Sequence, residues 1–405
     1  MKNKIKKSSS FFKINSLNEL IDGVDIAVSF SLIPFLAFFY FQNLDNRLAT
    51  ILTLLIVSLS FIIRFLVPFI VLKFGNQIIL YRKNLFLIVL PIFYLLPIIT
   101  PNLSSLMYIN IFLLGISRLA VGFIISLNNN FLSEYYKNTI TSFTNVSYWL
   151  TFLIGIFIGI SCSIFINQIF SNSELNNWAW KVGYVFPILL SIVFAILNDT
   201  NKENLSQKVI SKEEFYTNFS SKDFVVYFLK NISILIPITY ILFFCFNSWL
   251  PGTVSPENMF FSEIKLVHIL FLFLTCLFSN FIFELIGREK VNTYFCSFML
   301  IMSMVLFFLV EHKTTYSINF LHFFVAFISS ISLNLFFYDI KVFFSKNYFS
   351  TFFLCLNIPF LIASFLIPFF VYYLMFYIID YNVIYLLIFI IFLISLIAKK
   401  YLTKI

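Results

Sequence analysis

The chain has 405 residues, of which 60% are hydrophobic and only 11% are charged, and its formal net charge is +9. Water-soluble domains carry about 25% charged residues, so this composition excludes a soluble globular fold and predicts that lipid bilayer is the main solvent of the chain. The basic residues lie in short segments between apolar stretches and form no contiguous face, which argues against nucleic acid as a partner.

The N-terminal segment from Met1 to Lys13 is basic and precedes an apolar stretch, as in a secretory signal peptide. The stretch from Gly23 to Phe41 is nevertheless long, lacks a small-residue cleavage site and is followed by another apolar stretch. We therefore expect a retained first transmembrane helix.

Six apolar stretches in the first half are each long enough to cross about 30 Å of hydrocarbon as a helix. They are Gly23 to Phe41, Leu48 to Val71, Asn84 to Ile99, Met107 to Leu127, Val146 to Phe170 and Val182 to Leu197. A polar segment from Asn198 to Asp223 follows and is the longest hydrophilic segment of the chain. It divides the sequence into two halves.

Six further apolar stretches make up the second half. They are Ile232 to Leu250, Ile264 to Ile286, Val291 to Val310, Ile318 to Phe337, Thr351 to Phe376 and Val383 to Ala398. The predicted organisation is an N-terminal tail (1–22), a six-helix half (23–197), a central loop (198–230), a second six-helix half (231–398) and a C-terminal tail (399–405).

The distribution of basic residues predicts the orientation of these spans. With the N-terminus inside, 21 of the 27 Lys and Arg residues fall on the inner side and only four on the outer side. The two others, Arg64 and Arg118, lie within spans. Because cytoplasmic loops are enriched in basic residues, we expect a multi-pass protein of a bacterial inner membrane with both termini and the central loop in the cytoplasm.

Six plus six spans around a long cytoplasmic loop is the layout of the major facilitator superfamily. A basic loop follows the second span at Arg82 and Lys83 and recurs after the eighth at Arg288 and Lys290, which indicates duplication. The predicted fold class is an all-α polytopic membrane protein with twelve transmembrane helices in two pseudo-symmetric six-helix halves, of major facilitator type.

Five motifs occur at defined places in this layout. They are Asp22-Gly23-Val24-Asp25, the run through Arg64 to Gly75-Asn76-Gln77, Arg118-Leu119-Ala120-Val121-Gly122, Trp178-Ala179-Trp180-Lys181 and Glu284-Leu285-Ile286-Gly287-Arg288. In this order they resemble the metabolite:proton symporter family of that superfamily, which contains carriers of proline and betaine, citrate, ketoglutarate and shikimate. Asn357 matches a family asparagine in the eleventh span.

The resemblance implies which residues carry substrate binding, coupling and gating. The substrate and coupling candidates are Asp22, Asp25, Arg64, Arg118, Asn128 and Asn357, and the gating candidates are Asn76, Gln77, Glu284 and Arg288. At Asn76, Gln77 and Asn128 the family carries Asp, Arg and Glu.

The two arginines lie deep within spans, where an unpaired charge costs several kcal/mol. Arg64 and Arg118 therefore have to face a partner or water. One hypothesis is that they attract a substrate carboxylate or control the protonation of a neighbour, and the other is that internal ion pairs or hydrogen bonds to carbonyls lock helices together. Asp22 and Asp25 share a helix face, either as gating or relay groups or as charges at a helix N-terminus.

The expected function is secondary active transport of a small polar metabolite, an amino acid or betaine or an organic acid, by proton symport with alternating access. The expected partners are the lipid bilayer, a carboxylate-bearing small molecule and protons, with no metal and no cofactor. The alternative is a transport-inactive relic or a membrane receptor, suggested by the changes at Asn76, Gln77 and Asn128. The chain has no GxSxG, Walker or HExxH motif, so no enzyme activity is expected.

Overall fold

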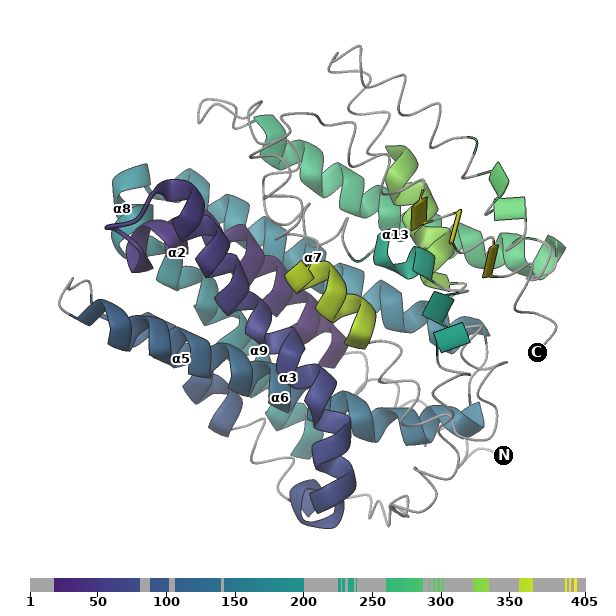
Figure 1. Cartoon of the computed structure of the whole chain (residues 1–405), viewed down its shortest axis with the longest axis horizontal. Helices are drawn as coiled ribbons and strands as arrows, with labels where there is room; N and C mark the ends of the chain where they lie inside the picture. The colour runs from purple at the N-terminus through teal and green to yellow at the C-terminus, as the bar shows by residue number, and fades with distance from the viewer. Residues whose placement is uncertain are drawn as a thin grey trace. The chain divides into compact units, whose positions relative to one another are not determined.

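The computed structural model in Figure 1 describes residues 18–80, 88–101, 106–139, 142–199, 260–286, 323–334 and 357–366, and short pieces within 225–238, 291–301 and 390–398. The chain divides into two compact units. The first contains the described residues up to Asn138, from Thr151 to Asp199 and from Phe260 to Leu266, and the second contains the others. The predicted domain boundaries around the central loop stay a prediction.

All regular structure in the described part of the first unit is helical. Its elements are an initial helix Asn18–Ser31, which we call the first helix, then α2 (Ile33–Tyr40), α3 (Asn46–Leu80), α5 (Leu90–Ile99), α6 (Met107–Thr139), α7 (Ser142–Ile169), α8 (Asn172–Asn177), the 3-10 helix η3 (Ala179–Tyr184) and α9 (Val185–Asp199). The start of α7 belongs to the second unit.

The described part of the second unit is helical as well. It contains η4 (Ile232–Ile234), most of α13 (Phe260–Ile286), a helix Phe323–Asn334 and a π-helical turn η5 (Ile362–Leu366). Asn334 Nδ2 donates hydrogen bonds to Cys276 O at 3.0 Å and to Ser279 Oγ at 2.6 Å, which ties the helix Phe323–Asn334 to α13.

Four described helices are long and apolar enough to cross a membrane, and a bent pair adds a fifth if it forms one span. The spans run from Leu48 to Val67, Met107 to Leu127, Trp149 to Ile169 and Leu266 to Phe283. Two helices continue past the predicted span ends at Val71 and Leu127, α3 to Leu80 and α6 to Thr139. Hydropathy predicts which residues lie in the membrane, and a helix can continue beyond them into water. The extensions of α3 and α6 were therefore not predicted.

The first predicted span is not one straight helix. The first helix and α2 meet at an angle of 55° around Leu32. Pro34 lies in the first turn of α2, where it has no N–H to donate and its ring would clash with the carbonyl of Phe30 in a continuous helix. The break therefore follows from the sequence, and the helix already includes Asn18, five residues before the predicted start at Gly23.

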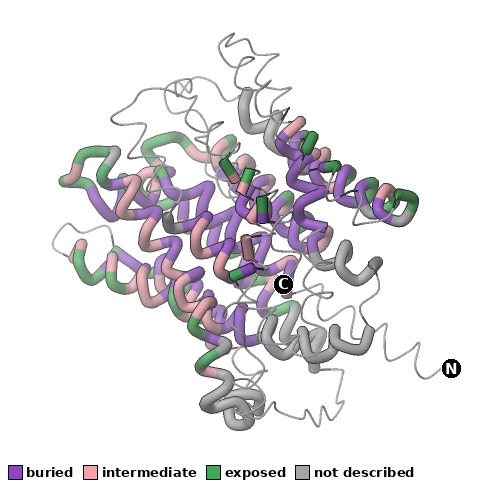
Figure 2. Tube along the Cα trace, turned by 45° about the vertical axis from the view of Figure 1, so that its right-hand side comes forward, coloured by how far each residue is buried: buried purple, intermediate pink, exposed green. Residues whose placement is uncertain are grey.

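Glycines set how closely four helices of the first unit approach. A Cβ built on Gly23 would collide with the backbone of Phe152, and one on Gly155 would collide with Leu20 O. The first helix and α7 therefore touch backbone to backbone, as small residues permit in membrane helices. Gly122 of α6 meets the backbone of Ser60 of α3 in the same way. Many residues of these helices are buried, and Figure 2 shows buried segments running along the described helices.

The motif at Trp178 to Lys181 joins three helix ends of the first unit. The fully buried Trp180 packs against Phe39, with ring centroids 5.1 Å apart. Lys181 Nζ donates to Thr100 O at 2.6 Å, at the residue that ends α5. The motif therefore connects η3 to the ends of α2 and α5.

The short α8 before this motif begins with a capping box. Ser171 Oγ accepts from Glu174 N, and Glu174 Oε2 accepts from Ser171 N at 2.8 Å. Ser171 Oγ also donates to Glu174 Oε2 at 2.7 Å, and this bond, with the one from Ser171 N, favours the charged carboxylate and lowers the pKa of Glu174.

Gly155→Ala should destabilise the protein, because the added Cβ meets the carbonyl oxygen of Leu20 and not a flexible side chain. We expect a loss of about 1–3 kcal/mol, as for other overpacked sites, measured as a lower melting temperature in detergent. Gly115→Ala is the matched control, since its Cβ would find only Leu59 Cδ1 at 3.7 Å. Equal melting temperatures for the two variants would contradict the packing described here.

Candidate functional site

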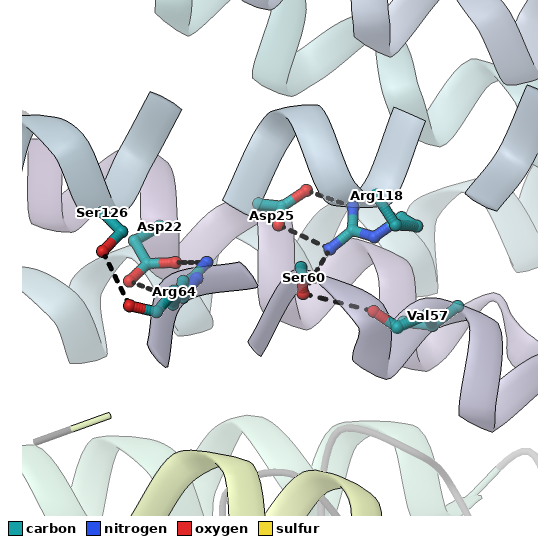
Figure 3. A network of polar contacts seen from close by, with 7 residues as sticks. All are labelled: Asp22, Asp25, Val57, Ser60, Arg64, Arg118 and Ser126. Carbon is teal, nitrogen blue, oxygen red and sulfur yellow. Dashed lines mark hydrogen bonds and ion pairs between the residues drawn. The ribbon is translucent and has the colours of Figure 1, made fainter. Parts of the chain in front are cut away.

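Two ion pairs lie buried between helices of the first unit (Figure 3). Arg64 donates to Asp22 through Nη1 at 2.8 Å and through Nη2 at 2.5 Å. Arg118 donates to Asp25 through Nη1 and Nη2, both at 2.8 Å. Each guanidinium thus grips one carboxylate with two parallel hydrogen bonds, the strongest geometry available to this pair of groups.

The local sequence explains how two neighbouring aspartates pair with arginines from two different helices. Asp22 and Asp25 are three residues apart on the first helix, which places them on one side and about 4.5 Å apart along the axis. Arg64 comes from α3 and Arg118 from α6, so one face of the first helix is held by two neighbours.

Two serines link the helices that supply the arginines. Ser60 Oγ of α3 accepts from Arg118 Nη2 at 3.5 Å and donates to Val57 O at 3.2 Å. Ser126 Oγ of α6 donates to the main-chain carbonyl of Arg64 at 3.3 Å. Together with the backbone contact at Gly122, these bonds hold α3 and α6 as a pair that faces the first helix (Figure 3).

The electrostatics of the site follow from the permanent charge of arginine. A guanidinium stays protonated in proteins, so each buried arginine requires a counter-charge. The Arg118–Asp25 side chains are 0% exposed, and the Arg64–Asp22 side chains are 5% and 4% exposed. With both carboxylates ionised, the four groups sum to zero charge. The two pairs are therefore balanced in charge without any further ion.

Two tyrosines and a serine surround the deeper pair. Tyr94 of α5 and Tyr184 of η3 are fully buried and interact electrostatically with both Asp25 and Arg118. Ser29, one turn after Asp25, is also fully buried and interacts with Tyr184. These residues could not be singled out from the sequence, because the chain has 21 tyrosines and serines are common in its spans.

The structure brings some of the predicted site residues together and leaves the others untested. Four of the candidates come together in the first unit, namely Asp22, Asp25, Arg64 and Arg118. Of the two hypotheses for the arginines, the observed geometry is the internal ion pair. The two aspartates are buried partners, 3% and 0% exposed, and not solvated charges at a helix end.

The other candidates are not tested by the structure. Asn357 is buried, 6% exposed, in the second unit. The side chains of Asn76, Gln77, Asn128 and Glu284 lie outside the described part, although their backbones are helical, and Arg288 lies outside it altogether. Their predicted roles in gating, coupling and binding stay predictions.

Several solved membrane transporters share the fold over nearly the whole chain. The crystal structure of a D-xylose–proton symporter has a TM-score of 0.70 at 13% identity, covering 98% of this chain and 97% of that one. A partially occluded, inward-open structure of the xylose transporter XylE from E. coli has a TM-score of 0.69 at 13% identity, covering 98% and 97%. An outward-facing bacterial homologue of the iron transporter ferroportin has a TM-score of 0.65 at 9% identity, covering 96% and 98%.

A family model described as "Sugar (and other) transporter" matches residues 13–212, which include both ion pairs. A comparison with curated proteins finds no match. The fold is that of a major facilitator superfamily symporter, which confirms the predicted fold class. The match to the family model covers just under half of the chain, and the structural neighbours show its fold. Its resemblance to metabolite:proton symporters within the superfamily stays a prediction.

The Asp25–Arg118 pair should show strong coupling in a double-mutant cycle of stability. Asp25→Asn leaves Arg118 buried without its counter-charge, at a cost of about 3–5 kcal/mol. Arg118→Gln should cost less, because the carboxyl of Asp25 can take up a proton whereas a guanidinium cannot lose one. Asp25→Asn with Arg118→Gln should recover most of the loss. Melting temperatures in detergent that fall additively would contradict this pairing.

Proposed function

We propose that the chain is a proton-coupled carrier of a small, neutral, polyhydroxylated solute such as a sugar, working by alternating access. The observation that carries the proposal is the buried pair of Asp25 and Arg118, both 0% exposed. Asp25 supplies a buried carboxylate that can bind a proton, and its contact with Arg118 depends on the position of the first helix relative to α6.

Protonation and helix separation are linked at this pair. A carboxyl that binds a proton loses its charge and one of the two acceptors that Arg118 uses. The reverse also holds, because separating the first helix from α6 removes the cation that favours the ionised form. Proton binding at Asp25 therefore favours a conformation in which the two helices are apart, which is the coupling that a symporter requires.

The same geometry bears on the substrate. The terminal nitrogens of Arg64 and Arg118 are engaged by Asp22 and Asp25, which disfavours either arginine as the binding group for a substrate carboxylate. A neutral solute does not need a free arginine for its binding. The description of the matching family and the D-xylose–proton symporters among the structural neighbours support a sugar over an amino acid, a betaine or an organic acid.

The orientation in the membrane is part of the proposal. The excess of basic residues in the predicted inner loops supports cytoplasmic termini and a cytoplasmic central loop, in a bacterial inner membrane. With this orientation the first helix begins near the cytoplasmic side, and the proposed proton site lies within the membrane.

A flux assay tests the substrate class. Purified protein in proteoliposomes should accumulate a sugar, with D-xylose the first probe, when the outside is acidic, and a protonophore should abolish the accumulation. The same vesicles should not accumulate proline, glycine betaine or citrate. Gradient-driven uptake of a carboxylate alone would contradict the neutral-solute proposal, and no flux of any compound would favour a relic or receptor.

The coupling role of Asp25 is tested by separating driven uptake from exchange. Asp25→Asn with Arg118→Gln should abolish accumulation against a gradient, because neither new side chain titrates, while sugar exchange between the two sides continues. The matched control is Asp45→Asn, at an exposed aspartate that precedes α3, where Asn caps a helix as well as Asp. If the paired variant still accumulates sugar, Asp25 is not the coupling group.

A further inference from the structure

The helix Phe323–Asn334 of the second unit carries polar side chains although it is buried. All seven residues from Ile328 to Asn334, about two turns, are buried. Four of them are polar, namely Ser329, Ser330, Ser332 and Asn334. A buried polar group is costly without a hydrogen-bond partner, and in a membrane helix such groups serve either contacts between helices or the path of a solute. The hydrogen bonds of each side chain separate these two uses.

One side of this helix is used for a contact with α13. Ser330 and Asn334 are four residues apart and share that side. Asn334 Nδ2 donates to Cys276 O and Ser279 Oγ of α13, while Asn334 Oδ1 is an unpaired acceptor. Ser330 Oγ donates to Phe327 O of its own helix at 2.7 Å. These two polar residues therefore serve the packing of the second unit.

Ser329 and Ser332 lie on another side of the helix. They are three residues apart, and at about 100° per residue their common side is about 150° around the helix from that of Ser330 and Asn334. The two residues are 0% and 1% exposed. Within the part of the chain that the structure describes, neither hydroxyl has a hydrogen-bond partner. The helix thus has a second polar side, which carries two unpaired hydroxyl groups.

These hydroxyls differ from other buried hydroxyls of the chain. Ser163, Ser191 and Thr275 each donate to a main-chain carbonyl about one turn earlier in their own helix. This bond is the usual way in which a helix satisfies a hydroxyl. Ser329 and Ser332 do not use it, so their donors and acceptors are available to another molecule.

We propose that Ser329 and Ser332 bind hydroxyl groups of the transported solute. The inference rests on the proposed function and adds contact residues for the solute in the second unit. A serine hydroxyl donates and accepts hydrogen bonds, as a sugar hydroxyl does. Side chains three residues apart on a helix are about 5–6 Å apart, a span that a sugar ring bridges with two of its hydroxyl groups. The helix carries no charged residue, so a carboxylate buried there would find no counter-charge on it.

Melting temperatures of the purified full chain in detergent, titrated with D-xylose, measure this binding. Ser329→Ala and Ser332→Ala should each weaken it about threefold to tenfold, the effect of one hydrogen bond. Without sugar, both variants should melt at or above the wild-type temperature, because each removes an unpaired buried hydroxyl. Ser330→Ala is the matched control on the same helix and should leave the affinity unchanged, since its hydroxyl is bonded to Phe327 O.

Deoxy analogues of D-xylose test whether the contact is direct. The analogue that lacks the hydroxyl bound by Ser329 should bind wild type weakly and should lose no further affinity in Ser329→Ala. Additive losses with every analogue would contradict a direct contact.

The outcomes separate this inference from the proposed function. Wild-type affinity for D-xylose in both serine variants would overturn the inference and leave the carrier proposal intact. Sugar-free melting temperatures well below that of wild type would overturn it as well, because the two hydroxyls would then be structural. If the wild-type chain binds none of a panel of pentoses and hexoses, the sugar proposal and this inference both fail.

Discussion

A buried guanidinium cannot lose its proton, and this constraint determines the arrangement of the first unit. Arg64 and Arg118 lie within spans, so each requires a carboxylate at hydrogen-bond distance. Both carboxylates come from one face of the first helix, while the arginines come from α3 and α6. The position of the first helix against these two neighbours is therefore fixed by charge, in a medium where apolar contacts alone give little specificity.

Close backbone packing makes this arrangement possible. Gly23 and Gly155 bring the first helix onto α7, and Gly122 brings α6 onto α3 at Ser60. The ion pairs then connect one glycine-packed helix pair to the other. Such a contact is well suited to a carrier, because it is strong while both carboxylates are ionised and weak once one of them takes up a proton. Hydrophobic packing offers no comparable dependence on proton concentration.

The sequence predicted the fold class and four residues of the site for physical reasons. Charges in the middle of apolar spans are costly, so Arg64 and Arg118 stand out, and the spacing of Asp22 and Asp25 places them on one helix face. Their partners could not be predicted, because the pairs join residues 42 and 93 positions apart. The sequence also does not distinguish an arginine that binds a substrate from one that pairs with an aspartate.

The central claim is that protonation of Asp25 releases the first helix from α6. Hydrogen exchange of the amides in residues 18–31, corrected for its intrinsic dependence on pH, measures this release directly. The account predicts that exchange in the wild-type chain accelerates as the pH is lowered, and that Asp25→Asn with Arg118→Gln abolishes this dependence. Exchange that is independent of pH in the wild-type chain would contradict the account.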